Sequence, residues 1–104
     1  MAANAELNER FDVGIDELVD AVDRALDDVQ AKCIQWSRSR RRVTAQIGVH
    51  ILFWGENLSV EIDPKGEVWV RSESAFPTII LDGGTNRRRC RAVLDAIADR
   101  LGLE

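Results

Sequence analysis

The hydrophobic residues of the chain follow two different periods, and the changes of period mark the predicted elements. After Gly14, apolar residues recur every three or four positions, at Ile15, Leu18, Val19, Val22, Leu26 and Val29. This spacing predicts an amphipathic α-helix whose opposite face is acidic. A second helix is predicted from about Arg87 to Leu101 and ends at Gly102, with an apolar stripe at Cys90, Val93, Leu94, Ile97 and Leu101.

Between the two helices, apolar and polar residues alternate, which is typical of half-buried strands. Strands are predicted at 31–37, 43–49, 58–63 and 68–73, with a short opening strand at 9–13. Asp63-Pro64-Lys65-Gly66 has the residues that a type I turn prefers, so the last two of these strands form a hairpin. The segment 75–81 is predicted as an apolar connection or short strand.

These elements predict an α+β fold in the order (β)-α-β-β-β-β-α. We expect a single antiparallel sheet of four to five strands with both helices packed on one face, because this arrangement buries both apolar stripes. The length of 104 residues is that of one domain. Residues 1–8 are small and polar, so a disordered N-terminal tail is predicted there and a single domain at 9–104.

The composition indicates a cytoplasmic protein. The first 25 residues carry acids where a secretory signal needs an apolar segment, and no apolar run approaches the ~20 residues of a membrane helix. The two cysteines, Cys33 and Cys90, are interpreted as buried free thiols, with a single disulfide as the alternative.

Charge is distributed unevenly along the chain. Residues 1–28 carry nine acidic and two basic residues, a net charge of −7, whereas residues 29–104 have a net charge of +3. The total of −4 disfavours a general nucleic-acid binder, whose domains carry a basic excess. Eight of the fourteen basic residues lie in two clusters, at 38–42 and 87–91.

The second cluster predicts a candidate anion site. Cations in the first turn of a helix oppose the positive end of its dipole, and a glycine-rich turn before a helix offers free backbone N–H groups to an anion. One hypothesis is therefore a phosphate or carboxylate site formed by Gly83, Gly84, Thr85, Asn86, Arg88 and Arg89. The alternative is structural: Asp82, the acidic first helix and the i,i+4 pair of Arg91 with Asp95 neutralise the arginines. Thr85 or Asn86 is the predicted N-cap of the helix.

Trp69 alternates with Val68 and Val70, so it is predicted on the face of the sheet opposite to theirs. An exposed aromatic residue there suits a docked partner or a stacked base, unless Trp54 or a dimer partner covers it. Trp36 follows the alternation of Ile34 and is predicted in the core.

Catalysis and metal binding have no motif in this sequence. His50 is the one histidine and lies in an apolar run, no Cys/His pair has the spacing of a zinc site, and no P-loop or complete dinucleotide fingerprint is present. The prediction is a protein that is not an enzyme, with no metal and no cofactor.

The C-terminal half resembles a known family. The stretch VWVRSESAFPTIILDGGTNRRRCRAVLDAI is similar to the C-terminal signature of an uncharacterised bacterial family, domain of unknown function 1499. The matching positions, mainly within Ser72 to Arg89, are Ser72, Ser74, Asp82, Gly84, Asn86 and Arg89. The chain differs from the family in Cys90, where an aliphatic residue is usual, and in lacking an export or membrane segment. The resemblance implies no known activity, and it marks Asp82 to Arg89 as the segment to test.

Two functions follow as hypotheses. The first is a protein-interaction module that uses the free sheet face to dock a partner or to form a homodimer. The second is a binding module for a small anionic ligand or nucleic acid, centred on Gly83 to Arg89 with Trp69.

Overall fold

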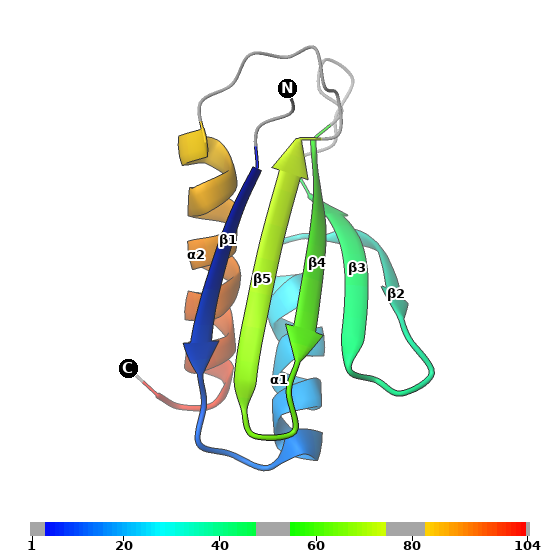
Figure 1. The fold of residues 1–104 in the computed structure, drawn as a ribbon, viewed down its shortest axis with the longest axis vertical. Helices are drawn as coiled ribbons and strands as arrows, with labels where there is room; N and C mark the ends of the chain where they lie inside the picture. The colour runs from blue at the N-terminus through cyan, green and yellow to red at the C-terminus, as the bar shows by residue number, and fades with distance from the viewer. Residues whose placement is uncertain (1–3, 48–54, 75–82, 104) are drawn as a thin grey trace.

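The structure is a computed structural model that describes residues 4–47, 55–74 and 83–103. It is a single open antiparallel sheet with two helices, as Figure 1 shows. The chain order is β1 (Asn4–Arg10), α1 (Ile15–Asp28), β2 (Lys32–Trp36), β3 (Arg42–Ile47), β4 (Glu56–Ile62), β5 (Glu67–Ser74) and α2 (Gly83–Arg100). The strands are arranged β1-β5-β4-β3-β2, and the predicted α+β class and one-sheet architecture are confirmed.

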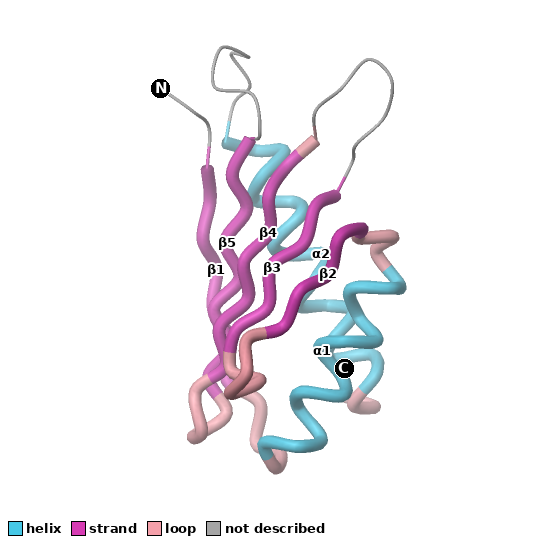
Figure 2. The backbone as a smooth tube through the Cα atoms, turned by 90° about the vertical axis from the view of Figure 1, so that its right-hand side faces the viewer, coloured by secondary structure: helices cyan, strands magenta, loops and turns pink. Residues whose placement is uncertain are grey.

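Both helices lie on the same side of the sheet, and Figure 2 shows none of the described helices or strands on the other side. The alternation of β3 places Val43, Ala45 and Ile47 toward the helices, and β4 and β5 contribute Leu58, Val60, Ile62, Val68 and Val70 to the same core. From α1, Leu18, Ala21, Val22, Ala25 and Leu26 are buried against them. Burying such aliphatic side chains is the main favourable term in folding, so this one core holds the helices against the same face of the sheet.

The turn between β4 and β5 forms as predicted. The backbone N–H of Gly66 donates to the Asp63 carbonyl, and the Lys65 N–H donates to the Asp63 carboxylate. Gly66 has φ +96°, and its carbonyl accepts a 2.8 Å hydrogen bond from the Phe11 N–H. Glycine is required here because a Cβ would lie 2.2 Å from the Phe11 carbonyl oxygen.

The N-terminal prediction needs correction. β1 begins at Asn4, so residues 4–8 of the predicted tail belong to the sheet, and the opening strand predicted at 9–13 lies earlier. β1 pairs with β5 at every position from Asn4–Glu73 to Arg10–Glu67. The strand has a weak sequence signal, because Ala5 and Leu7 are its only apolar residues that face the core. Ala5 is small, and both are only partly buried.

The outer strands of the sheet are β1 and β2. β2 is irregular, because its register with β3 shifts between Lys32 and Gln35 and Cys33 has φ +54°. This is a β-bulge, which bends an edge strand and interrupts its row of backbone hydrogen-bonding groups.

The start of α2 also differs from the prediction. The helix begins at Gly83, so the residues predicted as a glycine-rich turn form its first turn. At its other end, Arg100 makes two hydrogen bonds of 2.6 and 2.7 Å to the Asp28 carboxylate at the end of α1. These bonds lower the pKa of Asp28. The negative charge of Asp28 is unfavourable at the C-terminal end of α1, because that end of the helix dipole is also negative. In the described residues no helix is long and apolar enough to cross a membrane.

Candidate functional site

The residues predicted as an anion site lie in different environments. Asn86 is fully buried, and its side-chain oxygen accepts a 2.7 Å hydrogen bond from the Ser72 hydroxyl on β5. It is therefore not the predicted N-cap but a polar link between α2 and the sheet. Gly83, Gly84 and Thr85 lie in the first turn of the helix. Asp82 lies outside the described residues.

Arg89 is a structural residue. Its Nε lies 3.4 Å from a carboxylate oxygen of Glu56, and the Glu56 side chain is only 6% exposed at the start of β4. A buried carboxylate requires a charged or hydrogen-bonding partner, and Arg89 supplies it. Ser72–Asn86 and Glu56–Arg89 together form what we call the polar lock of α2.

The remaining arginines of the cluster fall into two groups, one with ion pairs and one without. Arg91 pairs with Glu9 at 2.9 Å and with Asp95 at 3.2 Å, which confirms the predicted i,i+4 pair. Arg87 and Arg88 are exposed and form no ion pair within the described part of the chain. The structural interpretation is thus supported for Arg89 and Arg91, although their partners are Glu9, Glu56 and Asp95 and not the acidic first helix.

Trp69 does not join this cluster. It lies on β5 and is half-buried on the face of the sheet that the helices leave open, opposite Val68 and Val70, as predicted. The strands therefore separate Trp69 from α2 and its arginines.

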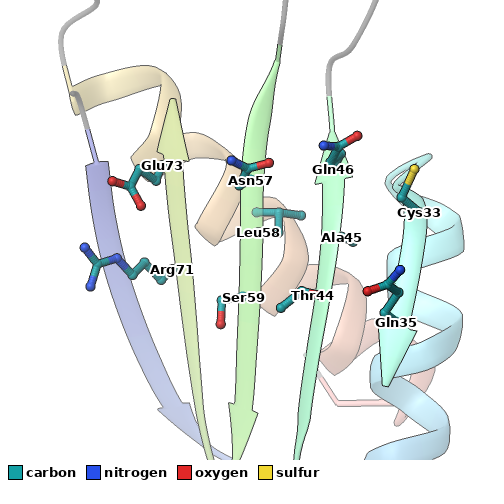
Figure 3. Close-up of a pocket in the computed structure, with 10 residues that line it drawn as sticks. All are labelled: Cys33, Gln35, Thr44, Ala45, Gln46, Asn57, Leu58, Ser59, Arg71 and Glu73. Atoms are coloured by element: carbon teal, nitrogen blue, oxygen red, sulfur yellow. The ribbon is translucent and has the colours of Figure 1, made fainter. Parts of the chain in front are cut away.

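The open face of the sheet is built from rows of polar side chains. The strand register places Gln35, Thr44, Ser59, Arg71 and Glu6 in one row across all five strands. The adjacent row contains Gln46, Asn57, Glu73 and Asn4. Figure 3 shows the amide, hydroxyl, Arg71 and Glu73 side chains on this face.

These rows line a trough of about 380 Å³ that runs from β2 to β5. A second hollow of about 300 Å³ contains Trp69, Arg42 and Glu61. The two share Ser59, Arg71 and Glu73, so they form one continuous surface, which we call the open-face trough. Its side chains offer many hydrogen-bond donors and acceptors, and its charges of both signs are interspersed.

Sequence analysis found Trp69 but missed the rest of the trough. The signal was present in the polar positions of each strand, such as Thr44, Gln46, Asn57 and Ser59, which are amides and hydroxyls rather than lysines or glutamates. Only the register of five strands shows that these positions are neighbours.

Both cysteines are free, and their environments differ. Cys90 is buried, and its thiol lies 3.5 Å from the Ala5 carbonyl oxygen; burial raises the pKa of this thiol. Cys33 is exposed at the bulge of β2 and lines the trough, so the prediction that both thiols are buried is wrong for Cys33. Trp36, predicted in the core, is half-buried, and its indole N–H donates to the Asp23 carboxylate at 3.0 Å.

Within the ranges that the structure describes, no three His, Cys, Asp or Glu side chains are grouped to hold a metal ion. His50 and Trp54 lie outside those ranges.

No family model matches the sequence, and a search of the curated proteins finds no match. Three of the positions that carry the resemblance described above, Ser72, Asn86 and Arg89, have defined roles in the polar lock of α2.

Proposed function

We propose that this chain is a non-enzymatic protein-interaction module whose open-face trough binds a partner protein. One observation carries the proposal: both helices cover the same face of the five-stranded sheet, and the other face presents a continuous trough with a half-buried tryptophan. Tryptophan and arginine are the residue types enriched where protein partners bind most strongly, and Trp69 and Arg71 are both in the trough.

The face of the sheet is a better candidate than its edges. A partner strand that extends the sheet needs a regular edge with free backbone groups. The bulge at Cys33 interrupts the β2 edge, and β1 carries charged residues at Glu6, Glu9 and Arg10. Bulges and charges are the usual means by which proteins prevent pairing at sheet edges.

The chemistry of the trough favours a transient complex with another protein over a permanent homodimer. Permanent dimer interfaces are strongly apolar, whereas Trp69 is the one large apolar side chain on the described part of this face. Rows of amides and hydroxyls suit a partner that exchanges hydrogen bonds with them and dissociates readily.

The experiment compares Trp69→Ala and Arg71→Glu with Ala92→Ser, an exposed position on α2 behind the sheet. Tagged proteins are expressed in the source cells, and the proteins that copurify are quantified by mass spectrometry. We expect the same partner to be lost with both trough variants and kept with Ala92→Ser. Light scattering is expected to show a monomer; a dimer that Trp69→Ala dissociates would replace the partner protein with a second copy.

A second candidate function is anion binding at the start of α2. It is favoured by Arg87 and Arg88, which are exposed and without an ion pair in the described residues, beside the first helical turn, whose N–H groups have no partner within the helix itself. The probes are phosphate, a nucleotide and a short single-stranded RNA in an amide-resolved NMR titration. Saturable shifts at Gly83 to Arg88 that Arg87→Glu with Arg88→Glu removes would support this function, and no shifts at millimolar ligand would exclude it.

We further infer that the protein works in the bacterial cytoplasm and that its fold is similar to that of domain of unknown function 1499. An exposed free thiol at Cys33 suits a reducing compartment. Three residues of the resembling segment form contacts between α2 and the sheet. Ser72 is hydrogen-bonded to Asn86, and Arg89 pairs with Glu56.

A further inference from the structure

A separate hollow, distinct from the open-face trough, lies on the helical side of the molecule between α1 and the β2–β3 hairpin. It has a volume of about 480 Å³, and we call it the α1 groove. Its floor is apolar and consists of Ile15, Val19 and Trp36, each of which is half-buried. These residues belong to the core-facing sides of α1 and β2, yet they remain accessible where the helix and the hairpin diverge.

One wall of the α1 groove is acidic. Asp16, Asp20 and Asp23 follow one another along α1 and line the hollow. Asp23 accepts the hydrogen bond from the Trp36 indole, which holds the tryptophan against the helix. Asp20 pairs with Arg24 at 3.0 Å, an exposed i,i+4 pair of small stabilising effect.

The opposite wall is basic. Arg40 and Arg41 come from the hairpin turn, which is ordered by hydrogen bonds from the Arg40 N–H to the Ser37 carbonyl and from the Arg42 N–H to the Ser37 hydroxyl. Arg42 points to the other face of the sheet, where it lies 3.9 Å from Glu61. Arg40 and Arg41 form no ion pair within the described residues, so no ion pair there joins the two charged walls across the hollow.

We propose that the α1 groove binds a short amphipathic helix of a partner protein. The apolar floor requires an apolar stripe on the partner, the acidic wall requires basic residues along one side of that stripe, and the basic wall requires acidic residues along the other. Ile15 and Val19 are four residues apart on α1, and such a row packs against the corresponding row of a second helix. The wall from Ile15 to Asp23 is about 12 Å long, which corresponds to slightly more than two helical turns.

A helix is favoured over an extended strand because β2 is irregular at its bulge and because Trp36, at the end of this strand, is hydrogen-bonded to α1. The site is independent of the open-face trough, since the sheet lies between them. Because turning a bound helix end for end exchanges its two flanks, the charge pattern also fixes the direction in which the partner helix runs along the groove, in the way that flanking charges set orientation in coiled coils.

The test uses two synthetic helical peptides of equal composition. Each has leucines at i, i+3, i+4 and i+7; the matched peptide has lysines along one flank of this stripe and glutamates along the other, and the mixed peptide has lysines and glutamates alternating along both flanks. Binding to the full chain is measured by NMR titration and by fluorescence of the three tryptophans. We expect the matched peptide to bind about tenfold more tightly at low salt, with shifts at Val19 and the Trp36 indole, and the preference to weaken with added salt.

The decisive control reverses charges on the two walls of the α1 groove. Asp16→Lys with Asp20→Lys and Arg40→Asp with Arg41→Glu reverse two charges on each wall, and Asp23 is kept because it accepts the hydrogen bond from the Trp36 indole. Asp is used at position 40 because φ there is +59° and Asp tolerates this conformation. This variant, shown by circular dichroism to be folded, is expected to bind the matched peptide in the opposite direction, which a spin label at the peptide N-terminus detects by broadening resonances at the other end of the α1 groove. Equal affinities for both peptides, binding that ignores the reversal, or no binding of either peptide at millimolar concentration would overturn the proposal.

Discussion

The polar lock of α2 makes a sharp prediction about stability. Truncation of Arg89 to alanine leaves the Glu56 carboxylate, 6% exposed, without its cationic partner. Breaking a fully buried ion pair costs about 3–5 kcal/mol, whereas exposed pairs contribute about 0–1 kcal/mol. The Arg89 side chain is 38% exposed and the contact is 3.4 Å long, so we expect a loss of about 2 kcal/mol in the free energy of unfolding.

The assay is urea unfolding followed by tryptophan fluorescence and circular dichroism. The midpoint is expected to fall with little change in the slope of free energy against urea, and the melting temperature to fall by about 10 °C. Arg88→Ala is the matched control: the neighbouring arginine is exposed and unpaired in the described residues, so its loss should change stability by less than about 0.5 kcal/mol.

A rescue experiment separates the ion pair from the packing of the arginine stem. Glu56→Gln in the Arg89→Ala background removes the uncompensated buried charge, so we expect it to recover about half of the loss. Equal stability of Arg89→Ala and Arg88→Ala would refute the reasoning, and Arg89 would then return to the candidate ligand residues at the start of α2.

Three further predictions concern single residues. Gly66→Ala is expected to destabilise the fold by at least about 2 kcal/mol in urea unfolding, because a Cβ at φ +96° would collide with the Phe11 carbonyl; a loss of a few tenths would contradict this geometry. A thiol reagent should label Cys33 rapidly and Cys90 only on unfolding, since Cys90 is buried and its pKa is raised; rapid labelling of two thiols per native chain would be inconsistent with this placement. Asp28→Asn should lower stability at neutral pH, where the carboxylate accepts two hydrogen bonds from α2. Because the pKa of Asp28 is lowered from 3.8 on folding, its contribution is present above that value, and the difference from the wild-type protein should disappear as the pH falls below it; a difference independent of pH from 7 to 2 would exclude this role.

The architecture could be predicted from periodicity because each element has a strong local signal. The stripe of α1 and the turn at Asp63–Gly66 are determined by residues close together in the sequence, and both form where predicted. β1 was placed too late because an edge strand with only Ala5 and Leu7 facing the core has little alternation to detect.

The candidate sites depend on contacts between distant segments, and these could be predicted only in part. The charge pattern at 87–91 indicated that the arginines need partners; Arg89 and Arg91 have them, but the partners Glu56 and Glu9 are far away in the sequence. Asn86 resembled an N-cap because its polarity and position suit one; its burial against Ser72 follows from the packing of α2 on β5. The face on which Trp69 lies needed only the alternation of one strand, and so it was predicted correctly.

The central claim, that the open face of the sheet is the binding surface, is tested most directly by site-specific photo-crosslinking in the source cells. A photoreactive amino acid replaces Ser59, which lines both hollows of the open-face trough, or Ala92, which is exposed on α2. The account predicts a discrete crosslinked product from position 59 that Trp69→Ala abolishes, and none from position 92. No product from position 59, or the same product from both positions, would contradict it.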